Sequence, residues 1–378
     1  MQQKLNEALS DQRKGIPIVV EQQTVSQYLD WWVEEVVRRQ NRPATYRSYE
    51  QLIRLHIKPL LGKTLLPKLS TQQVRSFLNQ KRDSGLSART VQYLHAVLRS
   101  ALSTAVRDEV LARNVMTLVK PPRVQAEEVR PLSPDEARSF VSHICGNRLE
   151  ALLTVAVSLG LRQGEALALR WRDIDMEVGT LRVRFALQRL KLRASKSVNS
   201  VNGVPTEEEP RTQIHLVEPK NKKSRRTIEL PQVTRTALAE HLGNQATDRV
   251  LAGSKWKPAE VHCEGRTEIM DDFGFTTSIG TPLEGRNVTK RFQRILKAAG
   301  IPHHRFHDLR HTAATLLAVQ GVHPKTIQSV LGWDQAAMVD RYTHFVDEMR
   351  KDAAEKMNSI LKPVAVSLAV KPASTKAS

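Results

Sequence analysis

The chain has 378 residues, enough for two or three domains, and its 58 Lys and Arg outnumber 39 Asp and Glu to leave a net charge of +19. That charge excludes an ordinary neutral enzyme and favours nucleic acid as the partner. Two cysteines are too few for a disulfide-stapled secreted scaffold, and without a signal peptide or a membrane-length apolar run we expect a cytoplasmic protein with no membrane partner.

Residues 24–118 carry the pattern of a small helical domain. Ser and Thr at helix starts and apolar residues at helical spacing mark its elements. The most regular apolar positions are Val91, Leu94, Val97, Leu98, Leu102 and Ala105. The expected helices are 24–37, 44–57, one that begins at Ser70, and 87–109.

Positive charge is concentrated in this helical part. Residues 24–123 hold 17 Lys and Arg but only 7 Asp and Glu, which supplies over half of the net charge of the chain. A solvated surface explains most single charges. An excess of this size favours a face that follows the phosphates of DNA.

A linker and a larger second domain follow. Residues 119–130 contain two prolines and no apolar periodicity, which is typical of an extended connection. Residues 131–362 mix helices and strands in the pattern of an α+β domain. Its expected strands are 180–188, 214–216 and 226–230. We expect the polar insertion 191–213 to be poorly ordered and residues 363–378 to form a tail.

One arginine lies in a turn between two apolar helices. The first helix stops at Gly160, and Arg162 precedes the second. An arginine held there either forms a structural ion pair with Glu165 or binds an anion. This segment alone favours the ion pair.

A basic hairpin precedes the strand that begins near Thr227. Its cationic residues are Lys220, Lys222, Lys223, Arg225 and Arg226. A soluble turn or a nonspecific phosphate contact would account for such a run. A lysine near arginines could also donate a proton.

A histidine and an arginine share one face of a helix within residues 303–317. His307 and Arg310 are three positions apart, so their side chains are neighbours on a helix. The segment up to His311 approaches the H-E-x-x-H zinc motif, with Asp308 in place of glutamate. Arg310 would repel zinc and no third ligand is evident, so we expect no metal. A satisfied core histidine is the simpler alternative for each ring.

Trp333 ends a short helix over 322–333, and Tyr342 follows it. A tyrosine on an amphipathic helix is most often only part of the packing. Tyr342 gains a functional interpretation from the other candidate residues.

The candidate residues together suggest phosphoryl transfer without a metal. The guanidinium groups of Arg162 and Arg310, with His307, could hold the oxygens of a DNA phosphate. Tyr342 would attack the phosphorus, and Lys220 would protonate the departing oxygen.

These motifs resemble those of the tyrosine recombinase (phage integrase) family over about residues 24–361. They are Gly160-Leu-Arg-Gln-Gly-Glu165, Pro219-Lys220, His307-Asp-Leu-Arg-His311, Leu331-Gly-Trp333 and Tyr342-Thr-His344. The resemblance implies a mainly α protein, with a helical SAM-like core-binding domain and an α+β catalytic domain that form a C-shaped clamp on DNA. It implies a catalytic set of Arg162, Lys220, His307, Arg310, Trp333 and Tyr342.

Two of these assignments need comment. Trp333 stands where most members have histidine, and its indole can donate a hydrogen bond but cannot transfer a proton. Proton transfer would then fall to Lys220 and His307. Because the insertion 191–213 lies near the hairpin, Lys222 and Lys223 are alternatives to Lys220.

The resemblance also implies the reaction and its partners. Each tyrosine joins a 3′ phosphate of a double-stranded core site and frees a 5′ hydroxyl, and a homotetramer exchanges strands through a Holliday junction. No cofactor is needed, because the phosphotyrosine conserves the bond energy. An excisionase or a host DNA-bending protein could assist. Residues 1–23 would be a remnant of an arm-binding module or a capping segment.

The expected function is therefore integration or excision of a phage or mobile element, at the nucleoid. A resolvase of chromosome or plasmid dimers would use the same chemistry. A catalytically silent DNA-binding regulator would not need the whole set of site residues, and a zinc hydrolase is disfavoured further.

Overall fold

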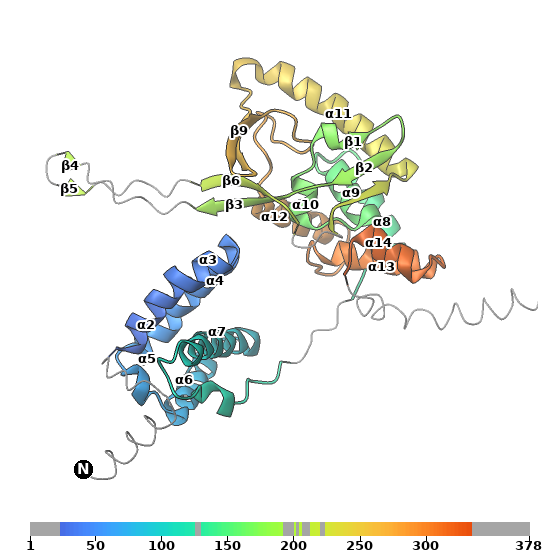
Figure 1. Cartoon of the computed structure of the whole chain (residues 1–378). Helices are drawn as coiled ribbons and strands as arrows, with labels where there is room; N and C mark the ends of the chain where they lie inside the picture. Colours follow the sequence, from blue (N-terminus) through green and yellow to red (C-terminus); the bar gives the residue numbers. More distant parts are fainter. Residues whose placement is uncertain are drawn as a thin grey trace, which may run out of the picture. The chain divides into compact units, whose positions relative to one another are not determined.

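The structure is a computed structural model that describes residues 23–124, 130–191, 200–201, 204–205, 212–219 and 224–334. The chain divides into two compact units, Met1–Glu128 and Val129–Ser378 (Figure 1). Within the described ranges, no helix is both long and apolar enough to cross a membrane.

The first unit is helical. Its helices are α2 (Val25–Trp31), α3 (Arg38–Gln40), α4 (Pro43–Leu52), α5 (Lys58–Leu61), α6 (Thr71–Asp83) and α7 (Ala88–Arg107), with π turns η1 (Trp32–Val37) and η2 (Ile53–Ile57) and 3-10 turns η3 (Leu66–Lys68) and η4 (Val115–Leu118). The predicted starts are confirmed, because the side chains of Thr24, Ser70 and Ser87 each accept a hydrogen bond from a backbone N–H three residues later. The π turns were not expected from the sequence.

Helix α7 provides the centre of the first core. All six apolar positions predicted for it are buried. Helix α2 and the π turn η1 that continues it each pack on α7 through one aromatic residue. The Tyr28 hydroxyl of α2 donates to the carbonyl of Ala101 at 2.9 Å, and the Trp32 indole of η1 donates to the Thr104 hydroxyl at 3.2 Å. These bonds satisfy the polar ends of large buried rings.

The second unit combines helices with small sheets. Its helices are α8 (Pro134–Ile144), α9 (Glu150–Leu159), α10 (Gln163–Leu167), α11 (Gln232–Ala252), α12 (Gly285–Ala298), α13 (Asp308–Val319) and α14 (Pro324–Leu331), with 3-10 turns η5 (Trp171–Asp173) and η7 (Gly253–Lys255). Its strands are β1 (Ile174–Asp175), β2 (Thr180–Val183), β3 (Ala186–Lys191), β4 (Ser200–Val201), β5 (Val204–Pro205), β6 (Thr212–Val217), β7 (Arg226–Glu229), β8 (Ala259–Cys263) and β9 (Arg266–Met270).

The strands form two sheets, in the orders β1-β2-β7 and β3-β6-β8-β9, and β4 and β5 pair separately as a third, two-stranded sheet. A single strand over 180–188 was therefore a wrong prediction. The chain leaves the first sheet after Val183 and enters the second at Ala186. Phe185 between them is buried, with the Arg170 guanidinium 4.9 Å from its ring centre, so this bend is fixed by packing.

The ends of the predicted insertion belong to a hairpin. Lys191 of β3 pairs with Thr212 of β6. Most of residues 191–213, for which we expect poor order, lie outside the described ranges. Residues 125–129 of the expected linker also lie outside them.

Helix α9 is the central element of the second unit. It is almost entirely apolar and buried, and it packs against both α11 and α13 (Figure 1). Gly160 ends it in the left-handed region, at φ +62°. A Cβ atom at Gly160 would overlap Cδ2 of Leu331 and lie 3.2 Å from Cβ of Ala313. The end of α9 therefore meets α13 and α14 at a tight junction.

Candidate active site

The predicted turn at Arg162 is confirmed, and it contains an ion pair. Arg162 is the N-cap of α10, and its backbone N–H donates to Glu165 Oε2 at 3.2 Å. Its Nη1 atom lies 2.6 Å from Glu165 Oε1. The Arg162 side chain is 41% exposed while that of Glu165 is 2% exposed. A buried carboxylate thus holds an arginine that still reaches the surface.

Arg310 is fixed by backbone carbonyls from two other elements. Its Nη1 donates to the carbonyl of Gly160 at 2.7 Å, and its Nη2 donates to the carbonyl of Leu331. The residue is only 1% exposed. Fork geometry makes guanidinium well suited to two simultaneous acceptors. These bonds join the start of α13 to the ends of α9 and α14.

His307 lies at the N-cap of α13, one residue before the helix begins. Its ring is 5.2 Å from that of His311, at an interplanar angle of 89°. Burial and the positive charges of Arg310 and Arg162 lower the pKa of His307, against a smaller opposing effect of Asp308. The ring is therefore neutral near pH 7 and can accept a proton.

His311 is also kept neutral. Burial and its neighbour His307 lower the pKa of His311 from 6.5 to about 4. In the described part of the chain, no group of three or more His, Cys, Asp or Glu residues could hold a metal ion. The two rings thus have no third ligand within those ranges.

Trp333 follows the left-handed Gly332 that ends α14. The residue is 4% exposed, and its ring centre lies 5.4 Å from the Arg310 guanidinium. The Trp333 backbone N–H donates to the carbonyl of Gln328 at 3.0 Å, and the Gln328 side-chain amide donates to the carbonyl of Trp333 at 3.1 Å, which fixes the position of Trp333 after the helix. Trp333 therefore packs against the arginine predicted to bind phosphate.

A second buried arginine completes this network, and the sequence interpretation did not single it out. The Arg226 side chain is 5% exposed, and its Nη2 lies 3.2 Å from Glu165 Oε2. Its Nε donates to the carbonyl of Val330 at 2.6 Å. The available signal was strand alternation, because Arg226 is two residues before the buried Ile228 and so points to the same side of β7.

Glu165 is ionised in this setting. Burial raises the pKa of its carboxyl, but the charges of Arg226, Arg162 and Arg310 outweigh burial and hold the pKa below its usual value. The carboxylate thus carries the negative charge that the three guanidinium groups share. An anion entering the site would meet an excess of positive charge.

The structure brings together four of the predicted site residues. Arg310 bonds to Gly160, two positions before Arg162, and also contacts Trp333. The positive charges of Arg162 and Arg310 both lower the pKa of His307. The other members of the predicted set, Lys220 and Tyr342, lie outside the described residues, as do Lys222 and Lys223.

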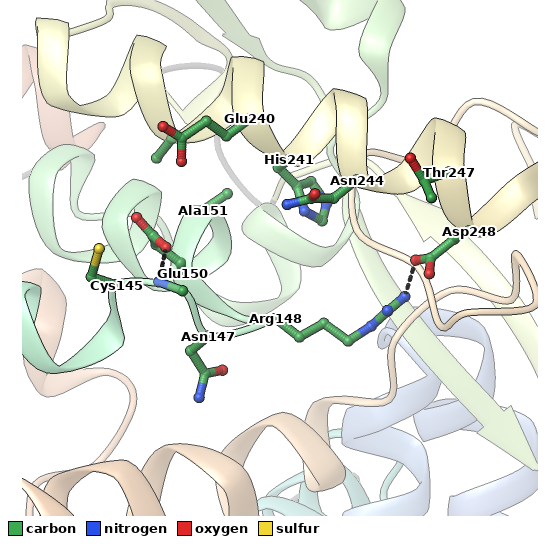
Figure 2. Close-up of a pocket in the computed structure, with 12 residues that line it drawn as sticks. Cys145, Asn147, Arg148, Glu150, Ala151, Glu240, His241, Asn244, Thr247 and Asp248 are labelled. Carbon is green, nitrogen blue, oxygen red and sulfur yellow. Dashed lines mark hydrogen bonds and ion pairs between the residues drawn. The ribbon is translucent and has the colours of Figure 1, made fainter.

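A hollow of about 500 Å³ lies elsewhere in this unit, between the α8–α9 turn and α11 (Figure 2). Arg148 and Asp248 form an ion pair of 2.6 Å along one side of it. Glu150 and Glu240 add further carboxylates. Its lining is net acidic and contains no predicted catalytic residue, so it does not suit a DNA phosphate.

Comparison with known families gives two matches. The profile of the Phage integrase family matches residues 130–349. The profile of the Phage integrase, N-terminal SAM-like domain, matches residues 24–82. Together the two profiles span most of the described chain.

Individual relatives agree with these matches. A tyrosine recombinase XerC-like protein of Caldanaerobacter subterraneus subsp. tengcongensis is 30% identical, over 94% of this chain and 88% of its own. An integrase of Saccharopolyspora erythraea is 30% identical, over 89% of this chain and 82% of its own. The fold resembles that of the Tn1549 transposon integrase solved with a circular intermediate DNA, with a TM-score of 0.68 at 21% identity, covering 88% of this chain and 99% of the other.

Proposed function

Because the chain belongs to the phage integrase family, the tyrosine recombinases, we propose that Tyr342 is the residue through which it cuts and rejoins DNA. The protein is a site-specific recombinase of a phage or mobile element. Tyr342 Oη forms a bond to the scissile phosphorus as the bond from phosphorus to the 5′ oxygen breaks. The products are a 3′-phosphotyrosine and a 5′ hydroxyl, and reversal with a new 5′ hydroxyl rejoins the strand.

Arg162 and Arg310 neutralise the phosphate in this proposal. The observation that carries it is the fixed Arg310 guanidinium, held by the carbonyls of Gly160 and Leu331. A guanidinium oriented before the reaction stabilises developing charge without having to reorganise. Since Arg310 is 1% exposed, contact with the phosphate requires a rearrangement around it when DNA binds.

Proton transfer is divided between a base and an acid. His307 accepts the phenolic proton of Tyr342, since the lowered pKa of its ring leaves the ring neutral near pH 7. Lys220 donates a proton to the departing 5′ oxygen, in keeping with its place among the cationic residues that precede β7. Trp333 contributes packing against Arg310 and a hydrogen-bond donor, not a proton.

Assembly follows from the stoichiometry of the reaction. Recombination of two duplexes breaks four strands, so a homotetramer supplies one tyrosine for each. Both units contact double-stranded DNA, and the 17 Lys and Arg against 7 Asp and Glu within residues 24–123 support this contact for the first unit. An excisionase or a host DNA-bending protein is the accessory partner expected for this reaction. The reaction takes place on nucleoid DNA in the cytoplasm.

The test is denaturing capture of the protein from cells that carry its element, followed by sequencing of the attached DNA. Wild type should retain DNA at one recurrent sequence, whereas Tyr342→Phe should retain none. Tyr93→Phe is the matched control, because Tyr93 is 50% exposed in the first unit and should be dispensable for covalent attachment.

Noncovalent DNA binding should be measured in the same three proteins. If Tyr342→Phe binds DNA but still becomes covalently attached, the assignment of the nucleophile is wrong. If wild type binds and never becomes attached, the cleavage mechanism is wrong.

A further inference from the structure

Arg226 joins three separate segments of the second unit. Its Nε donates to the carbonyl of Val330 at 2.6 Å, and its Nη1 donates to the carbonyl of Ser224 at 3.0 Å. Its Nη2 lies 3.2 Å from Glu165 Oε2. One guanidinium thus connects the start of β7, helix α10 and the last turn of α14.

These bonds interlock with those of the phosphate-binding arginines. Glu165 Oε1 accepts from the Arg162 guanidinium, and Glu165 Oε2 accepts from both the Arg226 guanidinium and the Arg162 backbone N–H. Val330 and Leu331 are consecutive, and their carbonyls accept from Arg226 and Arg310 respectively. Arg226 therefore lies between the acceptor that orients Arg162 and the backbone that holds Arg310.

Stability alone is a weak reason for this arrangement. The side chains of Arg226 and Glu165 are 5% and 2% exposed, so both charges have been removed from water. Desolvation of two such charges offsets much of their attraction, and well-packed apolar residues often stabilise a fold as well or better. A buried ion pair with this many directed bonds is better explained by the positions that it imposes on the segments it joins.

The place of Arg226 in the chain strengthens this view. It begins β7, directly after the segment that contains Lys220, and its acceptor Val330 lies shortly before Trp333. A shift of its guanidinium would therefore be passed to elements that carry several of the proposed catalytic residues.

We propose that Arg226 is a positioning residue for recombination, which acts through Glu165 on Arg162 and through Val330 on the acceptor of Arg310, without touching DNA. This inference rests on the proposed function. Errors of about 1 Å in a reactive arrangement can cost about 100-fold in rate. The loss should therefore appear in the cleavage step and not in DNA binding.

The experiment measures single-turnover formation of the covalent complex on a nicked core-site substrate, at saturating DNA. Arg226→Lys keeps the charge but loses the fork, and we expect cleavage about 10- to 100-fold slower. DNA affinity should change less than about twofold, since binding depends on exposed charges. Arg225→Lys is the matched control, because that neighbouring side chain is 53% exposed, and its cleavage rate should equal that of wild type.

A double-mutant cycle separates positioning from general damage. Because one of the two routes by which Arg226 acts runs through Glu165, Arg226→Lys should slow cleavage less in a Glu165→Gln background than in wild type. The pair Glu165→Gln with Arg226→Met removes both buried charges together, so it should fold while cleaving slowly. Thermal unfolding is recorded for every variant.

Three results would overturn the inference. They are an unchanged cleavage rate in Arg226→Lys, a loss that appears only as weaker DNA binding, and independent, multiplicative effects in the cycle. Tyr342→Phe distinguishes these results from failure of the proposed function. If that variant still forms the covalent complex, the nucleophile is wrong; if it does not and Arg226→Lys cleaves normally, only the role of Arg226 is wrong.

Discussion

Substitution of Gly160 by alanine should damage both stability and cleavage. Gly160 adopts φ +62°, where a residue with a Cβ atom costs about 1 to 2 kcal/mol. The added methyl would also overlap Leu331 Cδ2 and lie 3.2 Å from Ala313 Cβ. Overpacking of this kind costs about 1 to 3 kcal/mol. The total, about 2 to 5 kcal/mol, is a large part of the stability of a typical domain.

The matched control is Gly146→Ala. Gly146 has φ +72° but no atom within 4 Å of the position its Cβ would take. It should therefore lose only the backbone part, about 1 to 2 kcal/mol. Urea unfolding of both variants gives the two losses as shifts in midpoint at an unchanged slope.

Gly160→Ala should also slow cleavage more than Gly146→Ala does. The carbonyls of Gly160 and Leu331 both hold Arg310, so displacement of Leu331 should misplace the guanidinium and slow cleavage about 10- to 100-fold. Gly146→Ala should cleave at the wild-type rate where it is folded. Equal destabilisation of the two variants, or normal cleavage by Gly160→Ala, would refute the tight junction as the cause.

Three further predictions concern solution conditions. As the pH falls from 6.5 towards 4, wild type should lose more stability than His311→Asn, because this histidine is protonated at a higher pH in the unfolded state than in the folded state. Parallel pH profiles of urea unfolding for the two proteins would contradict this. Affinity for core-site DNA should fall linearly with salt on a log–log plot, and a flat response in a binding titration would exclude broad phosphate contact. Cleavage should proceed unchanged in chelator, and a loss restored by added zinc would contradict the metal-free mechanism.

The sequence predicts much of the fold because local signals were strong. Family membership and fold class are confirmed. The N-caps at Thr24 and Ser70 and the break at Gly160 were readable from side-chain chemistry. The junction between β2 and β3 could not be predicted in this way, because it depends on which sheet each strand joins. That pairing involves strands distant in the sequence. Helix α11 was missed, since exposed residues such as Leu251 obscure its apolar face.

The site was predicted unevenly for a similar reason. Arg162, His307 and Arg310 belong to recognisable motifs, and the structure places them around one junction. Arg226 was read as part of a run of positive charge, although its alternation with Ile228 indicated burial. Tyr342 remains a prediction.

The distance along the chain between the parts of this junction has a consequence during synthesis. Arg310 bonds to a carbonyl 150 residues earlier, at Gly160, and to another 21 residues later, at Leu331. At about 5 to 20 residues per second, a ribosome needs roughly 10 to 30 seconds to cover that span. Until Leu331 has been made, a nascent chain cannot lock the guanidinium in place. Unfinished copies should therefore be unable to cleave DNA.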